Sequence, residues 1–242
     1  TYQGCEYTLN IQGNRSAWTN RGSEEDVLNL INGEPWSFNQ GADIMPRTIL
    51  FHKFEQNPNN TWKMSRIEAD SDLKYIINDS KMTTGSDIET DGVEDRFIFN
   101  CYISKHLSPF LVSRPAKIFM PAEKRYNLWE CINDDDIALM NASTAYVFEN
   151  IKSELAISLR EYLEDKLNIR GKLYKQDFSL GRWLVLSNAG GANPCSAYID
   201  LNEIDATKLI IDQTLYWYLA DSEDEAIYIT GMLNSDALSD LI

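Results

Sequence analysis

The sequence has little cysteine, little histidine and few cations. Its four cysteines and two histidines include no C-x-x-C pair, which argues against a zinc site and against a disulfide framework. Reduced thiols in a cytoplasm are the simplest account of these cysteines, so we expect a cytoplasmic location. No run approaches the roughly 18 apolar residues that a membrane span needs, and we expect no membrane partner.

Catalytic signatures are also missing. The sequence contains no P-loop, no serine elbow and no strand followed by Gly-x-Gly-x-x-Gly. Acidic residues with a lysine, such as Asp70, Asp72 and Lys74, match a nuclease metal site only loosely. His106 has no Ser, Cys or Asp partner at a catalytic spacing, which favours a structural or surface role over general base chemistry. We therefore expect no complete active site and no metal site in this chain.

Length and patterning set the expected fold. The 242 residues, 43% of them hydrophobic, can bury a substantial core. Position 1 is Thr with no signal-peptide pattern after it, so we expect a piece of a longer protein. The pattern predicts an α+β fold with mixed, largely antiparallel sheets and packed helices. Residues 1–40 are predicted to be an irregular or helical lead-in with a short helix after Ser23, and residues 41–242 the α+β domain.

Two helices are predicted in that domain. Apolar residues recur at spacings of three and four between positions 145 and 167, which indicates one long amphipathic helix. Ser222 and Glu225 have the spacing of a capping box, so a C-terminal helix should begin at Glu223 and continue to about residue 241.

Strands are predicted where β-branched and aromatic residues gather. The aromatic run Tyr216–Tyr218 indicates a strand that leads directly into the C-terminal helix. Further strands are predicted at Thr48–Phe51 and Thr61–Ile67, and the polar stretch 79–92 is predicted to be a surface loop. The segment Arg182–Asp200 has two apolar runs around Asn, Gly and Pro, which is typical of a hairpin.

Charge is the feature that opposes nucleic-acid binding. The formal net charge is -15, whereas nucleic-acid binders usually present a basic surface. No Lys or Arg follows Lys208, but the stretches Arg47–Lys81 and Lys166–Arg182 are richer in cations. Folding could gather those cations on one face. Charge alone indicates a protein-binding or small-ligand module.

Four stretches follow one another in the order found in a known family. They are GADIMPRTIL at 41–50, VEDRFIF at 93–99 with SKHLSPF at 104–110, RWLVLSNAGGANPCSAYID at 182–200, and TLYWYLADSEDEAIY at 214–228. Together they resemble the target-recognition region of large N6-adenine DNA methyltransferases of restriction-modification systems. The third stretch departs from the family, because Ser187 replaces an aromatic residue and residues 189–193 differ from the usual Ser-Gly-Thr-Asn, which fits a different base preference.

The resemblance implies a domain that positions double-stranded DNA and reads bases for a catalytic methyltransferase domain of the same parent chain. The family's Asn-Pro-Pro-Tyr motif and cofactor loop do not occur here, so we expect no cofactor in this chain and S-adenosylmethionine in the parent protein. Fusion to a nuclease stays open. The candidate DNA contacts are Arg47, Lys53, Lys63, Arg66, Asn188, Gly190, Gly191 and Asn193.

Two alternatives stay open beside target recognition. An acidic protein-interaction module would dock a neighbouring domain or subunit through the acidic last segment and the aromatic strand. An acidic DNA mimic would bind basic proteins. Target recognition requires that the few cations converge on one electropositive surface bordered by the glycine-asparagine hairpin.

Overall fold

The computed structural model divides the chain into two compact units, Thr1–Ser37 and Phe38–Ile242. The structure describes residues 7–12, 15–20, 36–68, 70–77, 86–125, 128–190 and 195–235.

The first unit contains a β-hairpin. Strand β1 (Tyr7–Gln12) pairs antiparallel with β2 (Arg15–Asn20). The sequence of β1, YTLNIQ, alternates apolar and polar residues with the period of a strand. The prediction of an irregular or helical lead-in over residues 1–40 is therefore wrong for these strands. The helix predicted after Ser23 lies outside the described residues.

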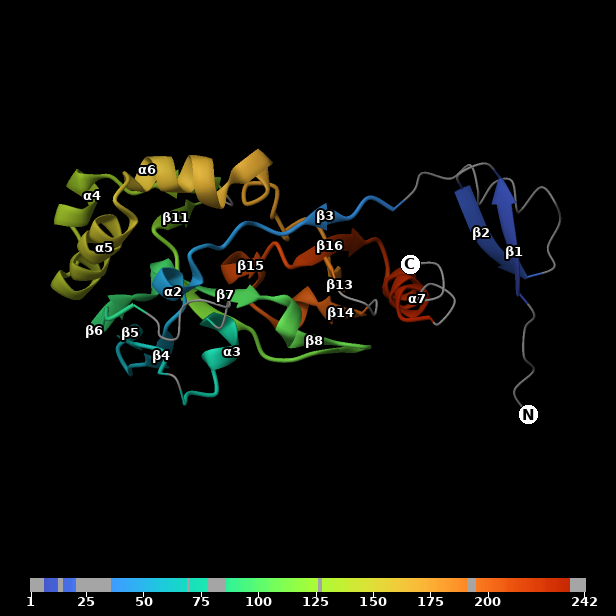
Figure 1. The fold of residues 1–242 in the computed structure, drawn as a ribbon, viewed down its shortest axis with the longest axis horizontal. Helices are drawn as coiled ribbons and strands as arrows, with labels where there is room; N and C mark the ends of the chain where they lie inside the picture. The colour runs from blue at the N-terminus through green and yellow to red at the C-terminus, as the bar shows by residue number, and fades with distance from the viewer. Residues whose placement is uncertain are drawn as a thin grey trace. The chain divides into compact units, whose positions relative to one another are not determined.

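The second unit is an α+β fold, as predicted (Figure 1). In its described part the ladders are antiparallel except for β15 with β7, which is parallel. The sheets have the orders β14-β13-β16-β3, β10-β7-β15, β4-β5-β6, β11-β12 and β8-β9. The strands are β3 (Asn39–Gln40), β4 (Lys53–Gln56), β5 (Thr61–Ser65), β6 (Thr90–Glu94), β7 (Ile98–Tyr102), β8 (Leu107–Ser108), β9 (Leu111–Val112), β10 (Ala116–Phe119), β11 (Ala122–Arg125), β12 (Leu128–Cys131), β13 (Trp183–Asn188), β14 (Ser196–Asp200), β15 (Leu209–Ile211) and β16 (Leu215–Ala220).

Helices cover both ends of this unit. Figure 1 shows α4 and α5 beside the β4-β5-β6 sheet at one end and α7 beside the four-stranded sheet at the other. The described helices and helical turns are α2 (Arg47–Leu50), α3 (Lys74–Ile77), η1 (Asp95–Phe97), η2 (Ser104–His106), α4 (Asp134–Ala138), α5 (Ala142–Leu155), α6 (Leu159–Glu161), η3 (Tyr162–Leu167), η4 (Ile169–Gly171), η5 (Leu201–Glu203), η6 (Ala206–Lys208) and α7 (Glu223–Leu233). No helix in the described part of the chain is both long and apolar enough to cross a membrane.

The C-terminal strand and helix confirm the sequence analysis. Strand β16 contains the aromatic run, and α7 begins at Glu223. The Ser222 hydroxyl accepts the Glu225 N–H at 3.1 Å, while the Glu225 carboxylate accepts the N–H of Asp221 at 2.7 Å. The side chain of Glu225 thus caps one residue earlier than in a capping box. Helix α7 ends at Leu233 with Asn234 as its C-cap. The predicted continuation to about residue 241 is therefore wrong at Asn234 and Ser235, and residues 236–241 lie outside the described residues.

The predicted strand at Thr48–Phe51 is wrong. Residues Arg47–Leu50 form the short helix α2, in which the Phe51 N–H donates to the Arg47 carbonyl at 2.9 Å. Pro46 stands immediately before the helix, where its restricted φ is compatible with a helix start. Strand β4 begins only at Lys53. The predicted surface loop at 79–92 ends earlier than expected, because strand β6 begins at Thr90.

The predicted single helix over 145–167 is interrupted. Helix α5 ends at Leu155, and Ala156 has a left-handed backbone with φ 55°. A new helical segment starts after Ser158, whose hydroxyl accepts the Glu161 N–H at 3.1 Å. Leu159 and Tyr162 are buried beyond the break, so the apolar pattern continues through it. That continuity explains why the sequence indicated one helix.

Candidate nucleic-acid interface

A buried hydrogen-bond network joins three of the four resembling stretches. Arg47 Nη2 donates to Asp212 Oδ1 at 2.8 Å, and the N–H and hydroxyl of Thr214 donate to the same oxygen at 3.0 and 2.7 Å. The Thr214 hydroxyl oxygen in turn accepts the Ser104 N–H at 3.0 Å. Arg47 begins α2, Ser104 begins η2, and Thr214 precedes β16. We call these four residues the Arg47 network.

The charges in this network are held away from water. The Asp212 side chain is 0% exposed and that of Arg47 12%. Burial raises the pKa of the Asp212 carboxyl above its ordinary value, while Arg47 and the Thr214 donors oppose that rise. Arg47 is thus an internal ion-pair partner and offers little of its guanidinium to a ligand. Removing one member of such a buried pair leaves an uncompensated charge.

The backbone packs closely around the network. The Ala42 N–H donates to the Ile211 carbonyl at 2.8 Å, and the Gln213 N–H donates to the Ala42 carbonyl at 2.7 Å. A Cβ on Gly41 would lie 2.2 Å from the Asp212 carbonyl oxygen. Glycine is therefore required at position 41 for this approach.

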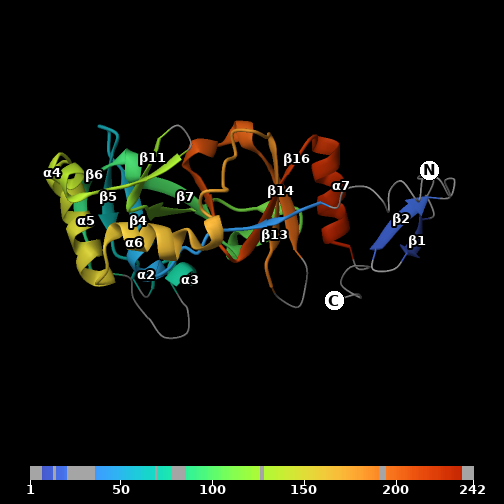
Figure 2. The same ribbon diagram turned by 90° about the horizontal axis from the view of Figure 1, so that it is seen from above.

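The β13–β14 hairpin turns beside the network. The Ala189 N–H donates to the Thr214 carbonyl at 2.9 Å. The Asn188 side chain organises the turn, because its Nδ2 donates to the Gly190 carbonyl and its Oδ1 accepts the Cys195 N–H, both at 2.9 Å. Among the described residues, no atom would lie within 4 Å of a Cβ on Gly190. Figure 2 shows strands β13 and β14 of this hairpin next to β16.

The other predicted contacts have different surroundings. Lys53 pairs with Glu55 at 2.9 Å, and Arg66 pairs with Asp87. Lys63 is exposed on β5, and its side chain has no ion pair or hydrogen bond to a described residue. Gly191 and Asn193 lie outside the described residues. Like Arg47, Lys53 and Arg66 already face carboxylates, so the predicted cations do not by themselves form an unpaired basic surface.

His106 has a structural role close to the network. Its Nδ1 accepts the Ile103 N–H at 3.1 Å, and the Ser113 N–H donates to its carbonyl at 2.8 Å. Burial, with a smaller contribution from the charge of Arg47, lowers the pKa of His106 to about 4. The neutral ring therefore carries its proton on Nε2, which lies 2.8 Å from the Tyr75 hydroxyl oxygen. This arrangement agrees with the structural role that the sequence favoured.

Three exposed cations lie close in the sequence to residues that contact one another around the Tyr75–His106 pair. Lys74 and Lys105 each precede one member of the pair, and Arg114 follows the short β8–β9 hairpin. All three are exposed, and within the described part of the chain none has an ion pair or a hydrogen bond from its side chain. We call Lys74, Lys105 and Arg114 the basic cluster. Sequence reasoning missed them because nothing local indicates that α3 and η2 meet.

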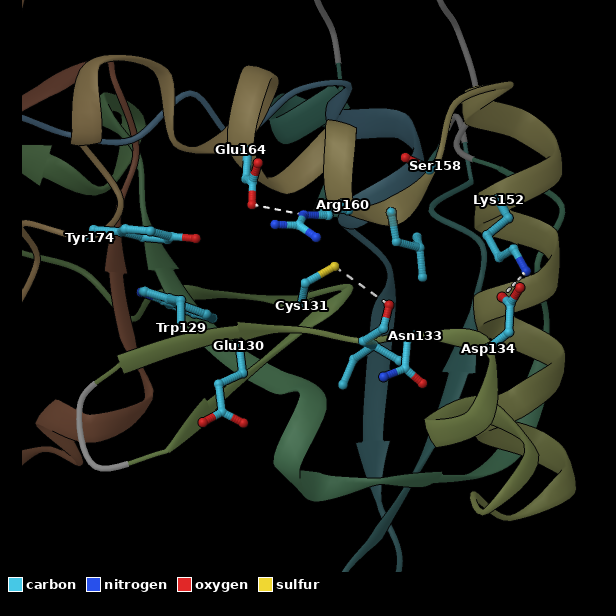
Figure 3. A pocket seen from close by; sticks show the side chains of 12 residues that line it. Trp129, Glu130, Cys131, Asn133, Asp134, Lys152, Ser158, Arg160, Glu164 and Tyr174 are labelled. Carbon is cyan, nitrogen blue, oxygen red and sulfur yellow. Dashed lines mark hydrogen bonds and ion pairs between the residues drawn. The ribbon is translucent and has the colours of Figure 1, made fainter.

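A hollow of about 560 Å³ lies between β12 and the helices (Figure 3). Cys131, Arg160 and Tyr174 point into it from different elements. Burial raises the pKa of the Cys131 thiol, which disfavours the nucleophilic thiolate. Arg160 is paired with Glu164 at 3.2 Å. Across the described residues, no three His, Cys, Asp or Glu side chains gather so that they could hold a metal ion.

Comparison with the models of known protein families and with curated proteins gives no match for this sequence. The four resembling stretches and the geometry around the Arg47 network are therefore the grounds for a functional interpretation.

Proposed function

We propose that residues 38–242 form a DNA target-recognition domain of an N6-adenine methyltransferase of a restriction-modification system. The domain positions duplex DNA and reads bases for a catalytic domain that is not in this sequence. S-adenosylmethionine and the methyl transfer belong to that catalytic domain, and no step of the reaction is assigned to residues of this chain.

One observation supports this proposal above the others. The resembling stretches are far apart in the sequence, yet three meet in the Arg47 network and the fourth contributes the hairpin turn beside it. A resemblance that arose by chance would have no reason to select segments that share one buried network. Ordered segments that meet at one place are what a common fold requires.

The charge distribution allows duplex binding by an acidic chain. Nine other cations in the described residues are paired with carboxylates, as in Arg182–Asp200 and Lys152–Asp134 at 2.6 Å each. The exposed Lys166, Arg170 and Lys175 have no ion pair to a described residue either. The basic cluster is not neutralised in this way. Because phosphate contacts dominate affinity and fix orientation, we assign the phosphate contacts to this cluster, with Lys63 as a further contact.

The hairpin turn supplies the groups that can contact base edges. The Asn188 side chain, the Ala189 N–H and the Gly190 carbonyl already hydrogen-bond within the protein, so base contacts are assigned to the remaining backbone groups of the turn, which match the donors and acceptors that base pairs present in a groove. Arg47 acts in this proposal as a positioning residue, since it holds the turn and η2 in place through Asp212 and Thr214.

Fluorescence anisotropy with labelled, mixed-sequence duplexes tests the proposal directly. We expect the purified chain to bind duplex DNA at low salt, with an affinity that falls as salt rises, because bound phosphates release counterions. Absence of binding even at low salt would contradict it. Single-stranded DNA of the same sequences is the matched ligand control.

A docking function is the competing candidate, and one feature of α7 favours it. Ile227 and Tyr228 are 49% and 48% exposed, and only Ala226 separates them from the three acidic residues of the first turn. An exposed apolar and acidic helix face is suited to a protein partner. This candidate predicts no duplex binding and tight association with the separately expressed catalytic domain, which the Ile227→Ser and Tyr228→Ser substitutions would weaken.

A further inference from the structure

The β8–β9 hairpin exposes a strained aromatic residue at its tip. Ser108 pairs with Leu111 across the hairpin, so Pro109 and Phe110 form the two-residue connection. Phe110 has φ 63° and is 66% exposed. A turn with proline first and positive φ second favours glycine at the second position. A bulky apolar residue there is disfavoured both by its backbone and by its contact with water.

The tip lies beside the hairpin to which base contacts are assigned. The Phe110 N–H donates to the carbonyl of Ser196, the first residue of β14, at 2.9 Å. Cys195, one residue earlier, is held by Asn188 on the other strand. The two turns are thus neighbours. The strands of the β8–β9 hairpin lead back to Lys105 on one side and Arg114 on the other.

We infer that Phe110 is a wedge that inserts its ring between base pairs of the bound duplex. This inference rests on the proposed function and deepens it. The cluster cations Lys105 and Arg114 contact phosphates on either side of the hairpin, and the anchored tip places the ring against the base stack. Apolar side chains inserted in this manner unstack a base step and deform the duplex. Loosened stacking at that step lowers the resistance to extrusion of a base.

A protein partner is the competing occupant of this tip. Phe110 and Leu111 border a hollow of about 610 Å³ that is also lined by the carboxylates of Asp200, Glu203 and Glu223. Those carboxylates repel phosphate and would suit a cationic segment. The exposure of Phe110 and the unpaired cations at the hairpin base favour DNA, and one of the three carboxylates, that of Asp200, is already paired with Arg182 at 2.6 Å.

Unwinding of closed circular plasmid DNA tests the wedge without knowledge of the recognised sequence. Plasmid is relaxed by a topoisomerase in the presence of the full chain, and the change in linking number is measured after protein removal. Insertion between base pairs unwinds the duplex, so wild-type protein should lower the linking number in proportion to protein bound. Anisotropy with short duplexes measures binding in parallel.

The variants distinguish the effect of the Phe110 ring from the effect of the backbone conformation at position 110. Phe110→Ala and Phe110→Gly should abolish the change in linking number and weaken duplex binding by about tenfold, the scale of losing one stacked ring. Phe110→Trp should retain the change. Leu139→Ala is the matched control, because Leu139 is an exposed apolar residue, 86% exposed, at the end of α4, which lies far from β8 in Figure 1. Phe110→Gly also removes the strained side chain, so a folding defect cannot account for its result.

The outcomes distinguish this inference from the proposed function. If wild type binds duplexes and unwinds plasmid but Phe110→Ala does not unwind, the wedge is supported. If Phe110→Ala unwinds and binds as wild type does, the wedge is wrong while DNA binding stands, and the tip is left to a protein partner. If wild type binds no duplex at low salt, both the proposed function and the wedge are rejected.

Discussion

Nη2 of Arg47 lies 2.8 Å from Oδ1 of Asp212, a residue 165 positions later in the chain, and both side chains are largely withheld from solvent. This ion pair ties the start of α2 to the turn before β16. It also makes Arg47, the most prominent candidate DNA contact in the sequence, part of the internal framework. An arginine that contacts DNA and an arginine that forms an internal ion pair cannot be distinguished from the sequence, and the structure gives Arg47 the second role.

Removing Arg47 should therefore destabilise the fold. Arg47→Ala leaves the Asp212 carboxylate buried without its partner, so we expect the free energy of unfolding to fall by about 3–5 kcal/mol. Urea denaturation followed by circular dichroism measures this. Arg160→Ala, which breaks the exposed pair with Glu164, should cost no more than about 0.5 kcal/mol. Equal stability of the two variants would show that the buried pair is not structural.

The close approach of the Gly41 backbone to the Asp212 backbone gives a second prediction. Gly41→Ala places a Cβ 2.2 Å from a carbonyl oxygen of Asp212, and the backbone must shift to accommodate it. We expect a loss of roughly 2 kcal/mol or more in the free energy of unfolding. Gly190→Ala is the control, since no atom of a described residue would lie within 4 Å of the added Cβ. If both alanine variants are as stable as wild type, the Asp212 carbonyl does not exclude a side chain at position 41.

The buried histidines predict a pH dependence of stability. Burial lowers the pKa of His52 and of His106 to about 4 each, below the ordinary value of about 6.5. The unfolded chain therefore binds protons first as the pH falls. The stability from each neutral ring is complete above pH ~6.5 and is lost toward pH ~4, at about 1.4 kcal/mol per pH unit.

The contribution of His106 can be isolated. His106→Gln should roughly halve the slope of unfolding free energy against pH between pH ~6.5 and ~5, because His52 retains its own share. Urea titrations at several pH values provide the slope. An unchanged slope would mean that His106 is protonated as readily in the folded protein as in the unfolded one.

The cap of α7 can be tested in isolation. Ser222→Ala removes the acceptor of the Glu225 N–H, and loss of such a cap costs about 1 kcal/mol. Ser222→Asp keeps an acceptor at the same position and should remain within about 0.5 kcal/mol of wild type. Thermal unfolding of the three proteins gives the comparison. If Ser222→Asp loses as much stability as Ser222→Ala, the hydrogen bond is not the source of the effect.

Local sequence signals predicted local structure well. The alternation around residue 62 indicated β5, the Asn-Gly-Pro segment indicated the β13–β14 hairpin, and the spacing of Ser222 and Glu225 indicated the start of α7. Each of these rests on neighbours in the chain. The turn at Pro46 was misjudged because Thr48–Phe51 is rich in strand formers, while the helix there is set by packing around the Arg47 network.

The features that the sequence did not predict depend on contacts between residues far apart in the chain. The partner of Arg47 follows it by 165 residues, and the meeting of Tyr75 with His106 joins segments 31 residues apart. Neither has a local pattern. The basic cluster depends on that meeting, so composition alone indicated only that cations were scarce. The left-handed backbone at Ala156 likewise interrupts a helix whose apolar spacing is continuous.

The salt dependence of duplex binding by the basic cluster tests the central claim most directly. The affinities of wild type and of the triple variant Lys74→Ala, Lys105→Ala and Arg114→Ala are measured across a salt series, with Arg160→Ala as the control. If the three cations each contact one phosphate, the slope of log affinity against log salt falls in magnitude by about 2.7 in the triple variant and stays unchanged in the control. Equal slopes for wild type and the triple variant would contradict the claim that this cluster holds the DNA.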